Sequence, residues 1–333
     1  MSDATIDVLG IGNAIVDVLT HSEDDFVEAH GLAKGAMTLI DATRAESIYS
    51  VMGPGVEVSG GSCANTMVGA AALGSRAAYL GKVRDDQLGR IFAHDIRSAG
   101  VAYDTIAAED GPPTARCLVL VAPDGQRTMA TYLGASVELG PDDVDPELVA
   151  AARITYLEGY LWDPPRAKEA FRAAMAAAGR AGRTVALTLS DPFCVERHRS
   201  EFRDLVDGEV DLLFANEDEI VSLYETDTFE EAAEQVRGRC GIAVLTRSEK
   251  GSLVVTPEAT HGVPAAPVQQ VVDTTGAGDL YAAGFLHGLA RGRDLPDCAR
   301  LGSLAAAEVI SHFGARPETS LVDLAHRAGL VPA

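Results

Sequence analysis

Hydrophobic and polar positions along the chain form two alternating kinds of segment. Three short apolar runs, residues 183–190, 210–215 and 242–247, have the composition of buried strands. Residues 165–179, which are rich in alanine, and residues 228–240 have helical composition instead. Strands that alternate with helices in this way predict an α/β fold, in which a mostly parallel sheet carries helices on both faces.

Other segments extend this picture. Four more helices are expected, over residues 62–73, 87–99, 279–290 and 296–312. Four β-rich segments without helical partners predict a second, smaller sheet, namely residues 16–20, 36–40, 116–121 and 127–132. The turn sequence Ala122-Pro123-Asp124-Gly125 joins the last two as a hairpin. Because no repeat or linker divides the chain, residues 1–333 are predicted to form one domain.

Composition restricts the class of partner. The chain has 333 residues, 47% of them hydrophobic, which is enough for a full α/β core. Its 49 acidic and 27 basic residues give a formal net charge of −22, which would repel nucleic acid and anionic membranes. A protein that acts on small molecules is therefore expected.

Cysteine usage and the N-terminal sequence favour a cytoplasmic location. The five cysteines are scattered and odd in number, which suits a reducing compartment and argues against structural zinc. The N-terminus carries Asp3 and Asp7 where a targeting segment would be basic. No apolar run reaches the roughly 18 residues of a membrane helix.

The most informative feature is the sequence from Asp273 to Asp279, Asp-Thr-Thr-Gly-Ala-Gly-Asp, which runs directly into the apolar residues 280–289. Small residues let successive N–H groups converge on one point, and a following helix adds the positive end of its dipole. A phosphate group could bind there, with Asp279 facing its reaction partner. The same residues could also form a simple glycine-rich turn, in which Asp279 caps the helix.

A second motif, Gly60-Gly61-Ser62-Cys63-Ala64-Asn65, favours the phosphate site over the simple turn. The two motifs, in this order, resemble the signatures of the ribokinase-like (PfkB) sugar and nucleoside kinases. The resemblance runs from Gly10 to Pro317 and is greatest to the adenosine kinase branch, in residues 156–161, 187–193 and 210–216. It implies a three-layer ribokinase-like fold, with a small β-sheet lid formed by segments near residues 14–20, 35–41 and 115–132.

The resemblance also implies a reaction, in which the γ-phosphoryl group of ATP passes to a primary sugar hydroxyl. Asp279 would be the general base, although a helix N-terminus is expected to lower its pKa. A loose transition state tolerates a weak base, because positioning and charge stabilisation matter more. The N–H groups of Gly276, Ala277 and Gly278 would stabilise the developing charge, and Arg127 would move over the phosphoryl group when the lid closes.

Further family positions imply an acceptor site. Gly10-Ile11-Gly12 resembles the start of a dinucleotide fingerprint, but Ile15 replaces the third glycine and a strand follows, which argues against NAD. In the family, residues matching Asn13 and Asp17 reach sugar hydroxyls, a role that suits an amide and a carboxylate. The site would be completed by Gly60, Gly61 and Asn65, whereas Cys63 is expected to be a packed residue.

Three shorter matches to the family imply where the nucleotide and its cations would bind. Asn216 and Glu219 follow a predicted strand and match a family element that implies support of Mg²⁺ through water, although Glu219 could simply favour a helix N-terminus. Thr246 and Gly251 resemble a nucleotide-binding loop in which Ser248 replaces a glycine. A monovalent-cation site of some family members is matched by Asp273, Thr275 and Gly314, so that K⁺ dependence is an open question.

Substrate identity stays open between three alternatives. The adenosine kinase resemblance implies a nucleobase pocket near Tyr160, Leu161 and Leu133. Glu158 could instead bind additional sugar hydroxyls, which would indicate a monosaccharide kinase of the ribokinase or fructokinase type. A non-catalytic nucleoside- or sugar-binding regulatory protein is the alternative of another class. The sequence does not distinguish a monomer from a homodimer.

Overall fold

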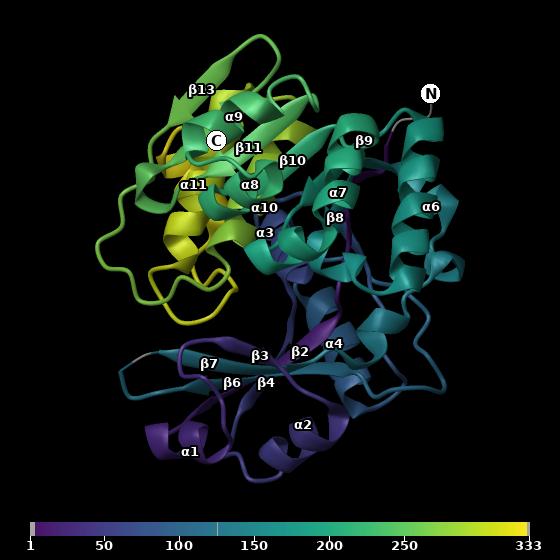
Figure 1. The fold of residues 1–333 in the computed structure, drawn as a ribbon, viewed down its shortest axis with the longest axis vertical. Coiled ribbons are helices and arrows are strands. Elements are labelled where there is room, and N and C mark those ends of the chain that lie inside the picture. The colour runs from purple at the N-terminus through teal and green to yellow at the C-terminus, as the bar shows by residue number, and fades with distance from the viewer. Residues whose placement is uncertain (1–3, 125, 332–333) are drawn as a thin grey trace.

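The computed structural model describes residues 4–124 and 126–331, which form two β-sheets with surrounding helices (Figure 1). The large sheet has eight strands in the order β13-β12-β11-β10-β9-β8-β1-β5. From β5 to β11 neighbouring strands pair in parallel, whereas β12 and β13 are antiparallel additions at one edge. The strands are β1 (Ile6–Ile11), β5 (Ala77–Leu80), β8 (Ala152–Glu158), β9 (Thr184–Thr188), β10 (Leu212–Asn216), β11 (Ile242–Thr246), β12 (Ser252–Val255) and β13 (Thr260–Val263).

Helices cover both faces of the large sheet, as the sequence predicted. Leu213 and Ala215 of β10 pack into a core with one set of helices, while Leu212 and Phe214 pack into the core on the opposite face. The first set is α5 (Pro146–Ala151), α6 (Pro165–Ala181), α7 (Pro192–Gly208), α8 (Glu217–Tyr224) and α9 (Phe229–Val236). The second is α3 (Ser62–Ala72), α4 (Gln87–Ser98), α10 (Ala277–Ala290) and α11 (Leu295–Val309).

The small sheet lies below the large one in Figure 1 and has the order β3-β7-β6-β2-β4. Its strands are β2 (Ile15–His21), β3 (Met37–Leu39), β4 (Val56–Gly60), β6 (Ala115–Val121) and β7 (Arg127–Tyr132). The predicted hairpin is confirmed, because β6 and β7 pair antiparallel and the N–H of Ala122 donates to the carbonyl of Gln126 at 2.9 Å. Gly125 of the predicted turn lies outside the described residues. Strand β4 was not predicted.

The remaining elements are short. They are the helices α1 (Asp24–Ala29), α2 (Ala42–Tyr49) and α12 (Leu321–Arg327), and the 3₁₀ turns η1 (Gly134–Glu138), η2 (Pro141–Asp143), η3 (Gly159–Trp162) and η4 (Ser248–Lys250). Helix α1 and helix α2 lie beside the small sheet, on the side away from the large one (Figure 1). Among the helices that the structure describes, none is long and apolar enough to cross a membrane.

Candidate active site

A cavity of about 410 Å³ lies between the two sheets, at the carboxyl ends of the parallel strands. The small sheet contributes Ile15, Asp17, Cys117, Met129 and Thr131 to its walls. The large sheet and its helices contribute Tyr156, Tyr160, Thr188, Phe214, Asn216, Glu219, Thr246 and the first turns of α3 and α10. Ligands of open α/β sheets bind at this edge, and most of the predicted site residues lie here.

The two glycine-rich motifs meet at Asp279, in the first turn of α10. Its carboxylate accepts hydrogen bonds from Oγ of Ser62 at 2.6 Å and from Nδ2 of Asn65 at 3.0 Å. Oδ1 of Asn65 is buried and has no hydrogen-bond partner within the described part of the chain. Asn65 and Asp279 both line the cavity, so a ligand there would contact the side chains that join the two motifs.

The pKa of Asp279 differs from the expectation. Burial raises it above the usual value of a carboxyl group, while the hydrogen bonds from Ser62 and Asn65 and the positive charge of Arg316 reduce the shift. The expectation of a lowered pKa was wrong because it considered the helix N-terminus and not the loss of solvent. A raised pKa would favour proton acceptance by Asp279, the role that the sequence predicted for it.

Asp17 faces the cavity from β2, close to both glycines of the early motif. Burial raises the pKa of Asp17 to about 7, against the positive charges of Arg316 and Arg127. A Cβ atom at Gly60 would lie 2.3 Å from Oδ2 of Asp17, and one at Gly61 would lie 2.3 Å from a backbone oxygen. Gly61 also has a φ of 97°, which side chains rarely adopt. Both positions therefore require glycine.

Asn13 lies behind the cavity wall. Its Nδ2 donates to Oε1 of Glu158 at 2.7 Å, and its Oδ1 accepts from Oγ of Ser136 at 2.9 Å. Glu158, which is 1% exposed, also accepts from the N–H of Cys63 at 2.9 Å, and burial raises the pKa of Glu158 to about 7. Neither Asn13 nor Glu158 lines the cavity, so both side chains support the wall from behind.

Arg127 reaches from the small sheet to the late motif. Its Nη2 lies 2.6 Å from Oδ2 of Asp273, and its Nε is buried with no hydrogen-bond partner among the residues described. Asp273 also accepts from the N–H and hydroxyl of Thr275, at 3.0 and 2.7 Å, and from the N–H of Gly314 at 3.0 Å. The three residues of the predicted monovalent-cation site are thus brought together, with an arginine at one carboxylate oxygen.

The late motif forms the N-terminus of α10, a helix of 14 residues. Gly276 precedes it with a φ of 78°, and Ala277 and Gly278 form its first turn. The N–H of Ala277 donates to the carbonyl of Thr274 at 3.2 Å, so this donor is shared with the turn. All three small residues line the cavity, where the positive end of the helix dipole favours an anion.

Asn216 and Glu219 form a reciprocal cap at the start of α8. Nδ2 and N–H of Asn216 donate to the two Glu219 oxygens at 2.7 and 2.9 Å, and the N–H of Glu219 donates to Oδ1 of Asn216 at 2.9 Å. Burial raises the pKa of Glu219 to about 7. No group of three or more His, Cys, Asp or Glu side chains that could hold a metal ion occurs in residues 4–124 and 126–331. Both oxygens of Glu219 are thus engaged by Asn216, and both residues line the cavity.

Of the two residues in the predicted nucleotide loop, only one lies at the cavity. Thr246 ends β11 and lines the cavity. Gly251 does not line it and occupies the turn between η4 and β12, with a φ of 86°. A Cβ atom there would lie 2.1 Å from the carbonyl oxygen of Val263, which explains the glycine without a ligand.

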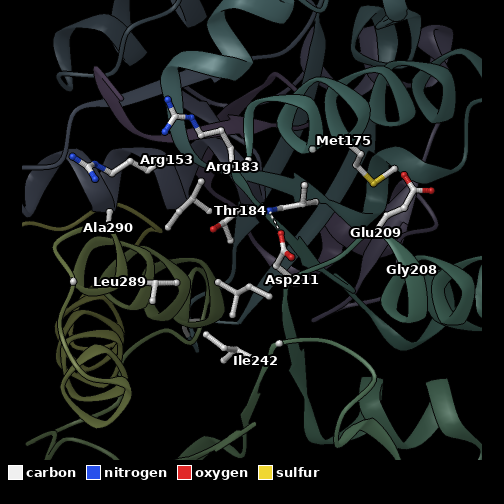
Figure 2. A pocket seen from close by; sticks show the side chains of 17 residues that line it. Arg153, Met175, Arg183, Thr184, Gly208, Glu209, Asp211, Ile242, Leu289 and Ala290 are labelled. Atoms are coloured by element: carbon white, nitrogen blue, oxygen red, sulfur yellow. Dashed lines mark hydrogen bonds between the residues drawn. The ribbon is translucent and has the colours of Figure 1, made fainter. Parts of the chain in front are cut away.

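A larger cavity, about 880 Å³, lies at the opposite edge of the large sheet (Figure 2). Its walls include Arg153, Thr184, Asp211 and Ile242 at the amino ends of the strands, together with the C-terminal ends of α6, α7 and α10. None of the predicted site residues lines it. Helix C-termini carry partial negative charge, which disfavours phosphate, so the smaller cavity is the candidate active site.

Two polar residues of the site were not predicted. Ser62 lies inside the Gly-Gly-x-x-x-Asn motif, at a position that the motif leaves free, although a serine in the first turn of a helix signals a hydrogen-bonding role. Arg316 lies beyond α11, and its charge acts on both Asp17 and Asp279. The sequence held no signal for Arg316 except its place in the family segment 314–317.

Comparisons with known proteins agree with this geometry. Residues 29–320 match the family described as pfkB family carbohydrate kinase. The crystal structure of adenosine kinase from Sinorhizobium meliloti is 56% identical, covers 98% of this chain and 100% of that chain, and superimposes with a TM-score of 0.91. That of a probable sugar kinase protein from Rhizobium etli is 53% identical, with the same coverage and a TM-score of 0.92.

A more distant relative aligns with most of the chain. The adenosine kinase of Saccharomyces cerevisiae is 25% identical in an alignment that covers 93% of this chain and 96% of that protein. The fold is ribokinase-like, with a large mostly parallel sheet and a smaller second sheet. The chain belongs to the pfkB family of carbohydrate kinases and is an ATP-dependent kinase that phosphorylates a hydroxyl group of a small molecule.

Proposed function

We propose that this kinase transfers the γ-phosphoryl group of ATP to the 5′-hydroxyl of adenosine. The observation that carries the proposal is the pairing of Asp279 with an apolar wall in one cavity. Ile15, Cys117 and Met129 line that wall from the inner face of the small sheet, and they continue into an apolar cluster of the same sheet. A purine base needs such a surface, whereas a free monosaccharide offers mainly hydroxyls. The 56% identity to an adenosine kinase supports the same substrate.

In this proposal Asp279 takes the proton of the 5′-hydroxyl. The hydroxyl oxygen forms a bond to the γ-phosphorus, and the bond from that phosphorus to the β–γ bridging oxygen breaks to release ADP. N–H groups at Gly276 and Gly278, together with the guanidinium of Arg127, would stabilise the negative charge on the transferred group. Asp17 and the free oxygen of Asn65 would hold the ribose hydroxyls.

The proposal includes one site for Mg²⁺ and one for a monovalent cation. When bound, Mg²⁺ neutralises charge on the nucleotide phosphates, and Asn216 with Glu219 would hold its waters. A potassium ion at Asp273, Thr275 and Gly314 would have to displace the guanidinium of Arg127, which lies 2.6 Å from Oδ2 of Asp273. A cytoplasmic location belongs to the proposal as well, since all five cysteines are buried and free.

One observation favours a sugar as acceptor instead, namely the 53% identity to a probable sugar kinase. Glu158, the residue that suggested this alternative, is already engaged by Asn13 and Cys63 and does not line the cavity. Its carboxylate therefore has no exposed face for extra sugar hydroxyls.

ADP release from Mg-ATP distinguishes the acceptors. The panel contains adenosine, inosine, ribose, fructose and a blank without acceptor. We expect kcat/KM for adenosine to exceed that for either free sugar by about 100-fold or more, because the apolar wall is occupied only by a base. A free sugar that is turned over faster than adenosine would refute the adenosine assignment, and equal ADP release in the blank would mean that water is the only acceptor.

A further inference from the structure

Arg316 lies in the loop between α11 and α12 and forms hydrogen bonds to residues on both sides of Gly60 and Gly61. Its Nη1 donates to the carbonyl of Ala64 at 3.3 Å, and its Nη2 donates to Oγ of Ser59 at 3.0 Å and to the carbonyl of Ser59. Ser59 is the next-to-last residue of β4 in the small sheet, and Ala64 lies in the first turn of α3 beside the large sheet. One guanidinium thus spans the turn at Gly60 and Gly61.

The same turn is held from a second direction by Asp95 of α4. Oδ2 of Asp95 accepts from the N–H of Ser59 at 2.8 Å and from its Oγ at 2.6 Å. Ser59 is 1% exposed, so these bonds are shielded from water. Asp95 and Arg316, which are both half-buried, are therefore two opposite charges joined through one buried serine.

Arg316 also provides positive charge to the acceptor side of the cavity. Its charge lowers the pKa of both Asp17 and Asp279 and so reduces the rise that burial causes in each. The other charged or titratable groups that act on these carboxyls, or are acted on by them, are Arg127, Cys63, Cys117, Tyr156, Glu158 and Tyr160. Arg127 is the only other cation in this set. It comes from the small sheet and is engaged by Asp273.

We propose that Arg316 is a positioning residue for the acceptor. Its guanidinium fixes the Gly60–Gly61 turn against α3, and its charge lets Asp17 and Asp279 face the acceptor together as carboxylates. Two adjacent carboxylates without such a cation would repel each other, and one of them would hold a proton. The inference rests on the proposed function, because this turn and these carboxylates form the acceptor site of that reaction.

The test compares Arg316→Gln, Arg316→Lys and the control Arg300→Gln. Arg300 lies on α11, half-exposed, and pairs with Asp297 away from the cavity. Steady-state kinetics are measured from about pH 5.5 to 8.5, where bell-shaped profiles report the essential groups. Calorimetry then gives the affinity for adenosine without ATP, and thermal unfolding shows whether each variant is folded.

For Arg316→Gln we expect KM and Kd for adenosine to rise about tenfold or more, with KM for ATP changed less than about twofold. The acidic limb of the kcat profile moves to higher pH, because Asp279 loses its cation. Arg316→Lys keeps the charge but not the two-pronged geometry, so it restores the pH profile and only part of the adenosine affinity. Arg300→Gln matches the wild type.

Three outcomes overturn the inference. Arg316→Gln with wild-type adenosine affinity and pH profile would exclude the positioning role while leaving the kinase assignment intact. An equal loss in the KM for ATP and for adenosine would mean that Arg316 maintains only the general structure, and an Arg316→Lys variant as impaired as Arg316→Gln in its pH profile would remove the charge argument. Wild-type protein that neither binds nor phosphorylates any acceptor of the panel would refute the proposed function and the inference with it.

Discussion

Replacing Asp279 with asparagine tests the centre of the mechanism. In the wild type two donors, Oγ of Ser62 and Nδ2 of Asn65, point at the carboxylate from 2.6 and 3.0 Å. An amide of the same shape has one oxygen and one NH₂ group, so the hydrogen bond from Asn65 can persist only if the new NH₂ group faces Oγ of Ser62, which would then accept and no longer donate. The side chain also loses its capacity to take the proton of the acceptor hydroxyl.

The size of the effect follows from these losses. Positioned proton acceptance contributes about 10²- to 10⁴-fold to a rate, so we expect kcat to fall about 1000-fold, or about 4 kcal/mol in the activation barrier. Asp279 is bonded to the acceptor motif, so KM for ATP is expected to change less than about twofold. The measurement is ADP release at saturating adenosine, together with ATP affinity by calorimetry.

Asp297→Asn is the matched control, because Asp297 occupies the first turn of α11 as Asp279 does in α10. Retention of kcat within about fivefold in Asp279→Asn would show that Asp279 is not the proton acceptor. A large rise in the KM for ATP would place its main role at the phosphates instead.

Two other carboxyls give separate predictions. Asp17→Asn should raise the KM for adenosine about tenfold and leave the KM for ATP nearly unchanged in steady-state assays, because Asp17 faces the cavity from the small sheet; equal changes in both would contradict an acceptor-side position. In the folded protein the pKa of Glu158 is about 7, above the usual 4.5, so between these pH values the folded state holds a proton on Glu158 that the unfolded state has released. The free energy of unfolding of the wild type therefore falls as the pH rises from about 4.5 to about 7. Between pH 5 and pH 8, denaturant unfolding should therefore show the stability of Glu158→Gln relative to the wild type improving by about 2.5 kcal/mol, and a pH-independent difference would refute the raised pKa.

The fold was largely predictable because its strongest signals are local. Strands β9, β10 and β11 are buried on both faces, and such strands read as continuous apolar runs. Strand β4 escaped prediction, because its apolar and its buried positions do not coincide: Val56 is exposed, whereas Ser59 and Gly60 are buried. Its place in the small sheet depends on pairing with β2, which is a long-range contact that a local pattern does not contain.

The site was predictable where a motif fixes both backbone and side chain. Asp279 and Asn65, which are 214 residues apart, meet as the two motifs implied. Asn13 matches the family position, yet its amide is engaged by Glu158 and Ser136, which no motif reveals. Arg316 contacts Ser59 across 257 residues, and an arginine in a loop carries no signal of the residue that it will reach. The missing information is the identity of partners brought together by tertiary packing.

Arg127 and Arg316 are held by different contacts, and from this difference we infer a different role for each. The protein carries a net charge of −22, and the cavity brings Asp17, Asp279 and Glu219 toward an anionic nucleotide. Arg127 belongs to the small sheet and pairs with Asp273 of the late motif. Arg316 is hydrogen-bonded to the backbone of Ser59 and Ala64, beside the Gly60–Gly61 turn. In the proposed reaction, Arg316 would therefore orient the acceptor side, and Arg127 would stabilise the charge on the transferred phosphoryl group.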